Sequence, residues 1–171
     1  KPLAYDSATC AEVVAAHRSA VAGGTPRAAV GFMRRFDPGY MAMKAAIGSR
    51  KHGRPLMIHS VGRGVSSGPG ATNESVIFNA AIHDLDLIPW LLDAPVTEVS
   101  WHAGNPSSTA TDLADPFLIL VRTADGSLST VEVFLNARYG YDIRCDAVCE
   151  TGVLTVTEPA KLLVNANLAT S

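Results

Sequence analysis

An apolar run that extends from residue 77 to residue 92 is interrupted by a few polar residues, among them Asn79, His83 and Asp86. Their spacing of i, i+4 and i+7 places them on one face of a helix. A helix this apolar is expected to be buried, and a buried polar group without a hydrogen-bond partner costs about 1–3 kcal/mol. Either a polar network in the core or a ligand must therefore satisfy this face.

His83 is the member of this group that could carry proton transfer. Asp86, on the next turn, could hydrogen-bond one ring nitrogen and fix the tautomer, as a general base requires. A single histidine in an apolar helix is more often a core residue, so both interpretations stay open. A zinc site built from His83, Asp86 and His59 lacks the usual ligand spacing, and no metal site is expected.

Other candidate ligand-binding residues adjoin expected strands. Arg34 and Arg35 follow a short apolar strand expected at residues 27–32, and α/β sheets bind ligands at the carboxyl ends of their strands. Tyr139 and Tyr141 would share one face of a later strand, although core packing explains two such tyrosines equally well.

A glycine-rich loop at residues 62–70 resembles a phosphate-binding turn only in part. Gly62-x-Gly64 follows an expected strand, but position 67 is serine and the next helix begins several residues later. A dinucleotide-binding turn needs its third glycine and a helix start at the pyrophosphate. The loop is therefore interpreted as a mobile lid beside the apolar helix.

Composition limits the class of protein. The 171 residues are 47% hydrophobic and carry a net charge of −2, which is typical of one globular domain and shows no basic surface for nucleic acid or anionic membrane. Three cysteines without motif spacing indicate neither a disulfide framework nor a structural zinc. No uncharged run of 18 residues exists, so no membrane span is expected. Because the first residue is Lys1, we expect a fragment or a processed form.

The first 33 residues read as the end of a larger parallel-sheet unit. A helix capped by Asp6 or Ser7 is expected to run to about residue 21, followed by the buried strand at 27–32. A helix followed by a continuously apolar strand is typical of parallel sheets, yet two elements do not make a sheet.

The remaining chain predicts helices followed by a run of strands. Asp37 should cap a helix over residues 38–50, and a strand at 56–61 precedes the apolar helix. Short β-branched and aromatic runs then follow at 96–102, 117–123, 127–136, 141–148, 153–156 and 162–164. The pattern predicts an α/β (α+β layer) fold with an open, mixed, largely antiparallel sheet, backed by helices on one face.

Several stretches together resemble the Gfo/Idh/MocA oxidoreductases, and within that family the inositol 2-dehydrogenases. They occur in family order across nearly the whole chain: Lys1–Ala4, Gly31–Tyr40, Pro55–His59, Ile82–Asp86 with Trp90, and Tyr139–Arg144. The resemblance implies a Rossmann domain followed by an α/β domain. Residues 1–33 would be the tail of the Rossmann domain, and residues 34–171 an incomplete substrate-binding and oligomerisation domain.

The resemblance also implies a cytoplasmic homo-oligomer, assembled through its open sheet, that uses NAD or NADP bound mainly by the missing domain. The substrate would be a polyol or sugar. The residues and the resemblance together assign catalysis to Lys1, Asn79, His83 and Asp86, substrate binding to Arg34, Arg63, Tyr139 and Tyr141, and cofactor contact to Lys1 and Pro2.

Three departures from the family pattern bear on function. Asn79 replaces the family aspartate and cannot ionise. Gly62-Arg63-Gly64 stands where His-Arg-Asn usually holds substrate hydroxyls, and Pro89 should kink the helix near the site. Two functions therefore stay open: hydride transfer between nicotinamide and a secondary alcohol of a cyclic polyol or sugar, or a paralogue that is a sugar-binding or structural subunit without turnover.

Overall fold

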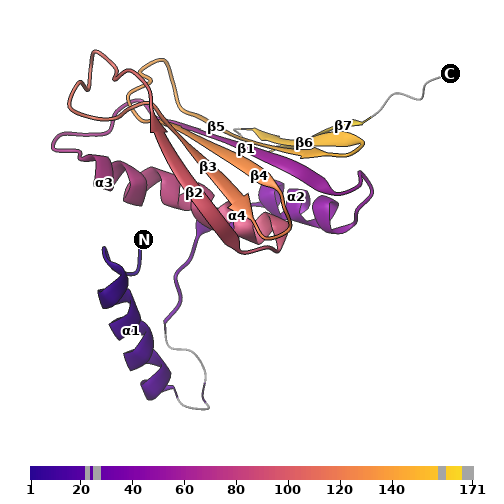
Figure 1. The fold of residues 1–171 in the computed structure, drawn as a ribbon, viewed down its shortest axis with the longest axis horizontal. Coiled ribbons are helices and arrows are strands. Elements are labelled where there is room, and N and C mark those ends of the chain that lie inside the picture. Colours follow the sequence, from indigo (N-terminus) through magenta and orange to yellow (C-terminus); the bar gives the residue numbers. More distant parts are fainter. Residues whose placement is uncertain (22–23, 25–27, 158–160, 167–171) are drawn as a thin grey trace.

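The computed structural model describes residues 1–21, 24, 28–157 and 161–166, and its centre is a seven-stranded sheet (Figure 1). The strand order is β2-β3-β4-β1-β5-β6-β7, with β1 and β4 parallel and every other neighbouring pair in the described chain antiparallel. The expected open, mixed sheet is confirmed. The strands are β1 (Pro55–Arg63), β2 (Val96–Ala103), β3 (Phe117–Thr123), β4 (Leu128–Phe134), β5 (Asp142–Cys149), β6 (Gly152–Thr157) and β7 (Lys161–Ala166).

Helices cover one face of this sheet (Figure 1). Met43 of α2 (Pro38–Gly48) and Leu87 and Leu91 of α4 (Ile82–Leu92) are at most 1% exposed and belong to one core cluster with strand residues such as Ile58. Burying such a side chain contributes about 1.5–3 kcal/mol, which is what holds the helices on the sheet. The helical segments are η1 (Met33–Phe36), α2 (Pro38–Gly48), α3 (Asn73–Val76), η2 (Ile77–Ala81) and α4 (Ile82–Leu92).

The start of α2 follows the predicted cap. The carboxylate of Asp37 accepts hydrogen bonds from the backbone N–H of Gly39 at 2.8 Å and of Tyr40 at 3.3 Å, and Pro38 occupies the first helical turn. A proline costs nothing there because its missing N–H would have no helical partner. The cap fixes the join between η1 and α2, so that Arg34 and Tyr40 face the same cavity.

The chain is helical over Asn73–Leu92, four residues longer at its start than the sequence predicts. Thr72 and Ser75 form a capping box: the Thr72 hydroxyl accepts from the Ser75 N–H at 3.1 Å, and the Ser75 hydroxyl accepts from the Thr72 N–H at 2.9 Å. The segment η2 is a π-helical turn, a rare conformation that is frequent at functional sites.

Pro89 lies inside α4 and removes a hydrogen bond to the carbonyl of Leu85. The helix nevertheless continues to Leu92 and ends at Asp93, which adopts the left-handed conformation with φ of 52°. Within the described ranges, Asn73–Leu92 is the one helix long and apolar enough to cross a bilayer by length and composition. Because its apolar side chains pack on the sheet, we interpret it as a core helix.

The opposite face of the sheet bears alternate strand residues without a helix over them in the described part of the chain. Along β1, Ile58 and Ser60 are buried on the helix side, whereas His59 and Val61 are half-buried on the other side. His59 Nδ1 lies 2.9 Å from the hydroxyl of Thr130 on β4. The predicted division into a covered and an open face is thus confirmed.

The N-terminal segment departs from the prediction in one element. Helix α1 (Ser7–Ala20) forms as expected, with the Asp6 carboxylate accepting from the Thr9 N–H at 2.7 Å, but it buries none of its residues and lies away from the sheet (Figure 1). The predicted strand is wrong over residues 28–32, which form no strand; Arg27 lies outside the described residues. A strand requires a partner for its backbone groups, and the described chain offers none there.

Candidate active site

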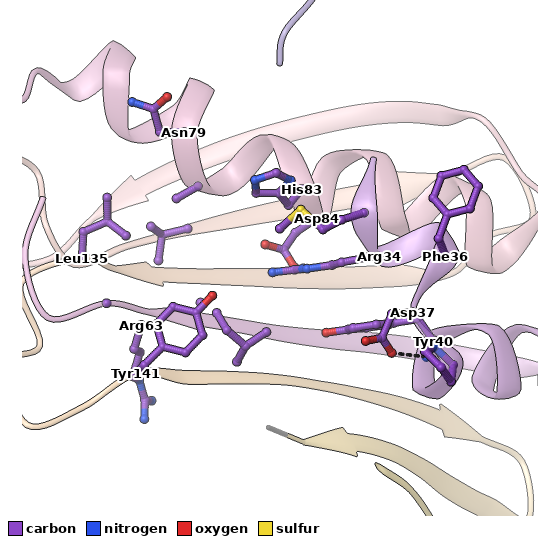
Figure 2. Close-up of a pocket in the computed structure, with 17 residues that line it drawn as sticks. Arg34, Phe36, Asp37, Tyr40, Arg63, Asn79, His83, Asp84, Leu135 and Tyr141 are labelled. Carbon is purple, nitrogen blue, oxygen red and sulfur yellow. Dashed lines mark hydrogen bonds and ion pairs between the residues drawn. The ribbon is translucent and has the colours of Figure 1, made fainter. Parts of the chain in front are cut away.

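A cavity of about 480 Å³ is lined by residues of η1, α2 and the long helix and by residues at the ends of strands β1 and β4 (Figure 2). Its polar wall is built from residues of three elements: Arg34, Asp37, Tyr40, His83 and Asp84. A concave site of this volume, with a few convergent polar groups, has the size and character of a small-molecule site. It is the candidate active site.

Asp84 is the buried centre of this site, and the sequence interpretation missed it. The residue is 1% exposed, and its Oδ1 accepts hydrogen bonds from the Arg34 guanidinium and from the Ser60 hydroxyl. One signal could have indicated it: Asp84 shares its helical stripe with the buried Leu87, Ile88 and Leu91. A carboxylate on a core-facing stripe must find partners, because an unpaired buried charge is very costly.

His83 lies in the cavity wall next to Asp84 and is only partly buried. Burial, together with the positive charges of Arg34 and Lys1, lowers the pKa of His83, and the negative charge of Asp84 only partly opposes this. A histidine with a lowered pKa is neutral at neutral pH and can accept a proton. Its Nδ1 is buried without a hydrogen-bond partner in the described structure, and its ring meets the edge of Phe32 with the centroids 6.5 Å apart.

The predicted hydrogen bond between His83 and Asp86 does not form. Both carboxylate oxygens of Asp86 are bound by Arg35, whose Nε lies 2.8 Å from Oδ2 and whose Nη2 lies 2.6 Å from Oδ1. A guanidinium offers a carboxylate two parallel charge-assisted hydrogen bonds, whereas a neutral imidazole can donate only one. Asp86 therefore ties η1 to α4, and the orienting role that we predicted for it is wrong.

Arg34 and Tyr40 lie next to each other in the cavity wall. The Arg34 guanidinium carbon is 5.7 Å from the centre of the Tyr40 ring and pairs with Asp84, so Arg34 does line the site as predicted. Burial raises the pKa of Tyr40, and its hydroxyl is buried without a hydrogen-bond partner among the described residues. The sequence pattern did not predict a role in the site for Tyr40.

The N-terminal residues border the His83 side of the site. Lys1 Nζ is 5.7 Å from the centre of the Phe32 ring and 3.8 Å from the sulfur of Met33, and the half-buried Pro2 follows it. Phe32 thus contacts both Lys1 and His83, which brings the lysine charge to the rim beside the imidazole.

Asn79 lies at the edge of the cavity, but its side chain is exposed. Figure 2 shows its amide pointing away from His83. The π-helical turn begins two residues earlier, so Asn79 and His83 are not related by the regular α-helical spacing that placed them on one face.

The remaining predicted substrate ligands differ in how they face the cavity. The Tyr141 hydroxyl points into it (Figure 2). Arg63 lines it, but its Nε pairs with Glu132 at 2.6 Å and its Nη1 with Asp142 at 3.0 Å, so two of its donors are already engaged.

Tyr139 does not share the face of Tyr141. It is 70% exposed, packs against Phe134 with ring centroids 6.4 Å apart, and lines a separate hollow. The strand begins only at Asp142, so both tyrosines precede it and the alternation of a strand does not relate their side chains. The predicted common face of the two tyrosines is therefore wrong.

Comparison with known proteins shows which family the chain belongs to. Residues 40–155 match the GFO/IDH/MocA C-terminal domain. The chain belongs to the Gfo/Idh/MocA family. This confirms the resemblance that the sequence motifs indicate.

Individual Gfo/Idh/MocA relatives are similar along almost the whole chain. Inositol 2-dehydrogenase 2 of Paenarthrobacter aurescens is 51% identical over 164 residues, which make up 95% of this chain and 49% of that protein. Inositol 2-dehydrogenase 4 of Saccharopolyspora erythraea is 43% identical, over 91% of this chain and 46% of that protein. The chain thus spans about half the length of the curated relatives it matches.

Among solved Gfo/Idh/MocA structures, the crystal structure of myo-inositol dehydrogenase from Lactobacillus casei in complex with NAD(H) and myo-inositol superposes with a TM-score of 0.80. The two sequences are 26% identical, and the superposition covers all of this chain and 48% of the Lactobacillus casei chain. The open sheet with helices on one face is therefore the fold of the inositol dehydrogenases of this family.

Proposed function

We propose that this chain is the substrate-binding half of an NAD(P)-dependent oxidoreductase that transfers a hydride between nicotinamide and a secondary alcohol of a cyclic polyol or sugar. The observation that carries the proposal is His83, a histidine with a lowered pKa in the wall of a polar cavity, beside the buried Arg34–Asp84 pair. The names of the two relatives described above, both inositol 2-dehydrogenases, support the same class of substrate.

In this proposal His83 is the general base. It takes the proton of the reacting hydroxyl as the hydride leaves the same carbon, a role worth roughly 10²–10⁴ in rate. Lys1 stabilises the negative charge that develops on the oxygen. Arg34 and Tyr141 donate hydrogen bonds to other hydroxyls, and Asp84 holds the Arg34 guanidinium toward the cavity.

A nicotinamide cofactor, when bound, supplies the hydride acceptor. The residues at the His83 side of the cavity fit such a ring, because Lys1, Phe32 and Met33 form a rim of apolar side chains with a single cation. Lys1 and Pro2 would contact the cofactor, and residues 1–33 would belong to the domain that binds most of it. We also propose that the protein works in the cytoplasm.

The direct test is an NADH-formation assay on the two-domain protein that contains this chain, with a panel of cyclic polyols and sugars. We expect turnover with at least one cyclic polyol and a parallel signal in the reverse direction with the corresponding ketone. Tight cofactor binding without turnover on any member of the panel would contradict the proposal.

That negative result would favour a second function, a paralogue that binds a sugar or serves as a structural subunit. Two observations favour this alternative. The Asn79 amide is exposed and directed away from His83 (Figure 2). Gly62 and Gly64 carry no side chains where the family pattern holds substrate hydroxyls.

We further propose that the open face of the sheet joins copies of this chain into a homo-oligomer. The face combines half-buried apolar residues with charges of both signs: Arg144 lies opposite Val61 on one side, and Glu132 lies opposite it on the other. A self-complementary patch of this kind suits a two-fold interface.

A charge placed in the middle of this face should prevent assembly. We expect Val61→Arg to lower the molar mass measured by light scattering, because the new cation would be buried beside Arg144. Val99→Arg is the matched control, since Val99 is already 54% exposed and lies opposite Val121, on the helix-covered side of the sheet. An unchanged molar mass in a folded Val61→Arg protein would refute assembly through this face.

A further inference from the structure

The two carboxylate oxygens of Asp84 have different surroundings. Within the described part of the chain, every side-chain hydrogen bond that Asp84 accepts ends on Oδ1, from the Arg34 guanidinium and from the Ser60 hydroxyl. Each oxygen of a carboxylate can accept about two hydrogen bonds. Oδ1 is therefore saturated, whereas Oδ2 keeps its capacity for a donor.

Oδ2 of Asp84 faces the candidate active site. It lies 4.0 Å from the position of a Cβ built on Gly62, and both residues line the cavity. Figure 2 shows the Asp84 carboxyl group between His83 and Arg34. The Tyr40 hydroxyl and His83 Nδ1 are fully buried without a partner, but Oδ2 is not among such atoms, so it keeps accessible surface that the cavity provides.

A hydrogen-bond donor from a ligand would satisfy this oxygen. Asp84 is 1% exposed, and a charged acceptor that is taken out of water without a donor costs free energy. A neutral donor suits the site better than an ammonium group, because Arg34 already balances the charge of Asp84 and Lys1 adds a second cation at the rim. The hydroxyl of a polyol is such a donor.

We propose that Asp84 is a specificity-determining residue, whose Oδ2 accepts a hydrogen bond from a second hydroxyl of the substrate while His83 takes the proton of the reacting hydroxyl. The inference rests on the proposed function, since it concerns the substrate of the same site. Asp84 and His83 are consecutive residues of α4, so the helix fixes the separation of the two groups. The substrate must then carry a free hydroxyl at one ring position besides the reacting carbon.

The first measurement uses the unmodified two-domain protein and a cyclic polyol that it oxidises. At each ring position besides the reacting carbon, the hydroxyl is replaced by hydrogen, by fluorine or by a methyl ether. None of these groups can donate a hydrogen bond. At one position we expect all three replacements to lower kcat/KM about 10–100-fold, the usual value of a hydrogen bond to a charged group.

The second measurement repeats the series with Asp84→Asn. The amide keeps one oxygen for Arg34 and Ser60 but presents an NH2 group, which cannot accept, in place of Oδ2. The penalty for losing the hydroxyl at that position should therefore largely disappear. A merely structural role of Asp84 would lower kcat/KM for all analogues alike and leave the dependence on ring position unchanged.

Ser60→Ala is the matched control. It removes a hydrogen bond from Oδ1 of the same carboxylate and leaves Oδ2 as it is, so the position-dependent penalty should persist. The absence of any position at which a donor is required in the unmodified protein would overturn the inference, and this result does not depend on the folding of a variant. An unchanged penalty at that position in folded Asp84→Asn would overturn it as well.

Calorimetric binding of the same analogues to the NADH-loaded protein separates the inference from the proposed function. A loss of affinity at one position that disappears in Asp84→Asn, without turnover of any polyol, would support the role of Asp84 and contradict the dehydrogenase activity. Turnover of the polyol and of every analogue at similar rates would support the activity and contradict the role of Asp84.

Discussion

Replacing Asp84 with alanine is expected to lower the free energy of unfolding by about 3–5 kcal/mol. The change leaves Arg34, a residue that is 8% exposed, without its counterion, and removes the acceptor of the Ser60 hydroxyl. Denaturant unfolding followed by circular dichroism measures the effect. The cost comes mainly from the charge left unpaired in the interior, not from the attraction that is lost.

Asp86→Ala is the matched control for this prediction. It removes the same charge two residues further along α4, but its partner Arg35 has a side chain that is 40% exposed. Water can solvate the freed guanidinium, so the loss should stay within about 1 kcal/mol. Equal losses in the two variants would contradict the view that burial of the Arg34–Asp84 pair decides the cost.

A double variant tests whether the unpaired charge, and not the lost packing, causes the loss of stability. Replacing both partners, with Arg34→Met and Asp84→Leu, removes the buried charges together and should recover most of the stability lost in Asp84→Ala. The double variant should still lose turnover, because the cavity would no longer present the guanidinium to a substrate. A double variant as unstable as Asp84→Ala would indicate that packing, and not charge, sets the loss.

Replacing His83 with alanine is expected to lower kcat of the two-domain protein roughly 10²–10⁴-fold, with little change in cofactor affinity. His59→Ala is the control, because His59 lies on the opposite face of the sheet and is hydrogen-bonded to Thr130. If kcat were unchanged in His83→Ala, the assignment of the general base would be wrong.

The pH dependence gives a second readout of His83. Only the neutral imidazole accepts a proton, so kcat/KM should rise with pH through the pKa of His83 and then level off. Burial and the charges of Arg34 and Lys1 lower that pKa, which places the rise below the ordinary histidine value near 6.5. A rise centred above that value would contradict the lowered pKa, and persistence of the same rise in His83→Ala would assign it to another group.

Local periodicity predicted most of the elements, including the helix that carries the site. The expected strands after Pro95 all form, within a few residues of their expected bounds. The missed start of the long helix shows where such reasoning stops: Asn73–Val76 are mostly polar, and only the cap formed by Thr72 marks the beginning. The failed strand at 28–32 shows the opposite limit, because strand propensity has no effect without a neighbouring strand.

The sequence by itself determined the family, the order of helices and strands, and the presence of His83 on a core helix, because each depends on residues close together in the chain. Only the tertiary structure decided which charges pair. Arg34 and Ser60 reach Asp84 from 50 and 24 residues away, while Arg35 takes Asp86 from His83. Such pairing depends on burial and on contacts between elements that are distant in the sequence. Periodicity along one helix therefore identified His83 as a site residue, but it selected Asp86 instead of Asp84 as the aspartate of the site.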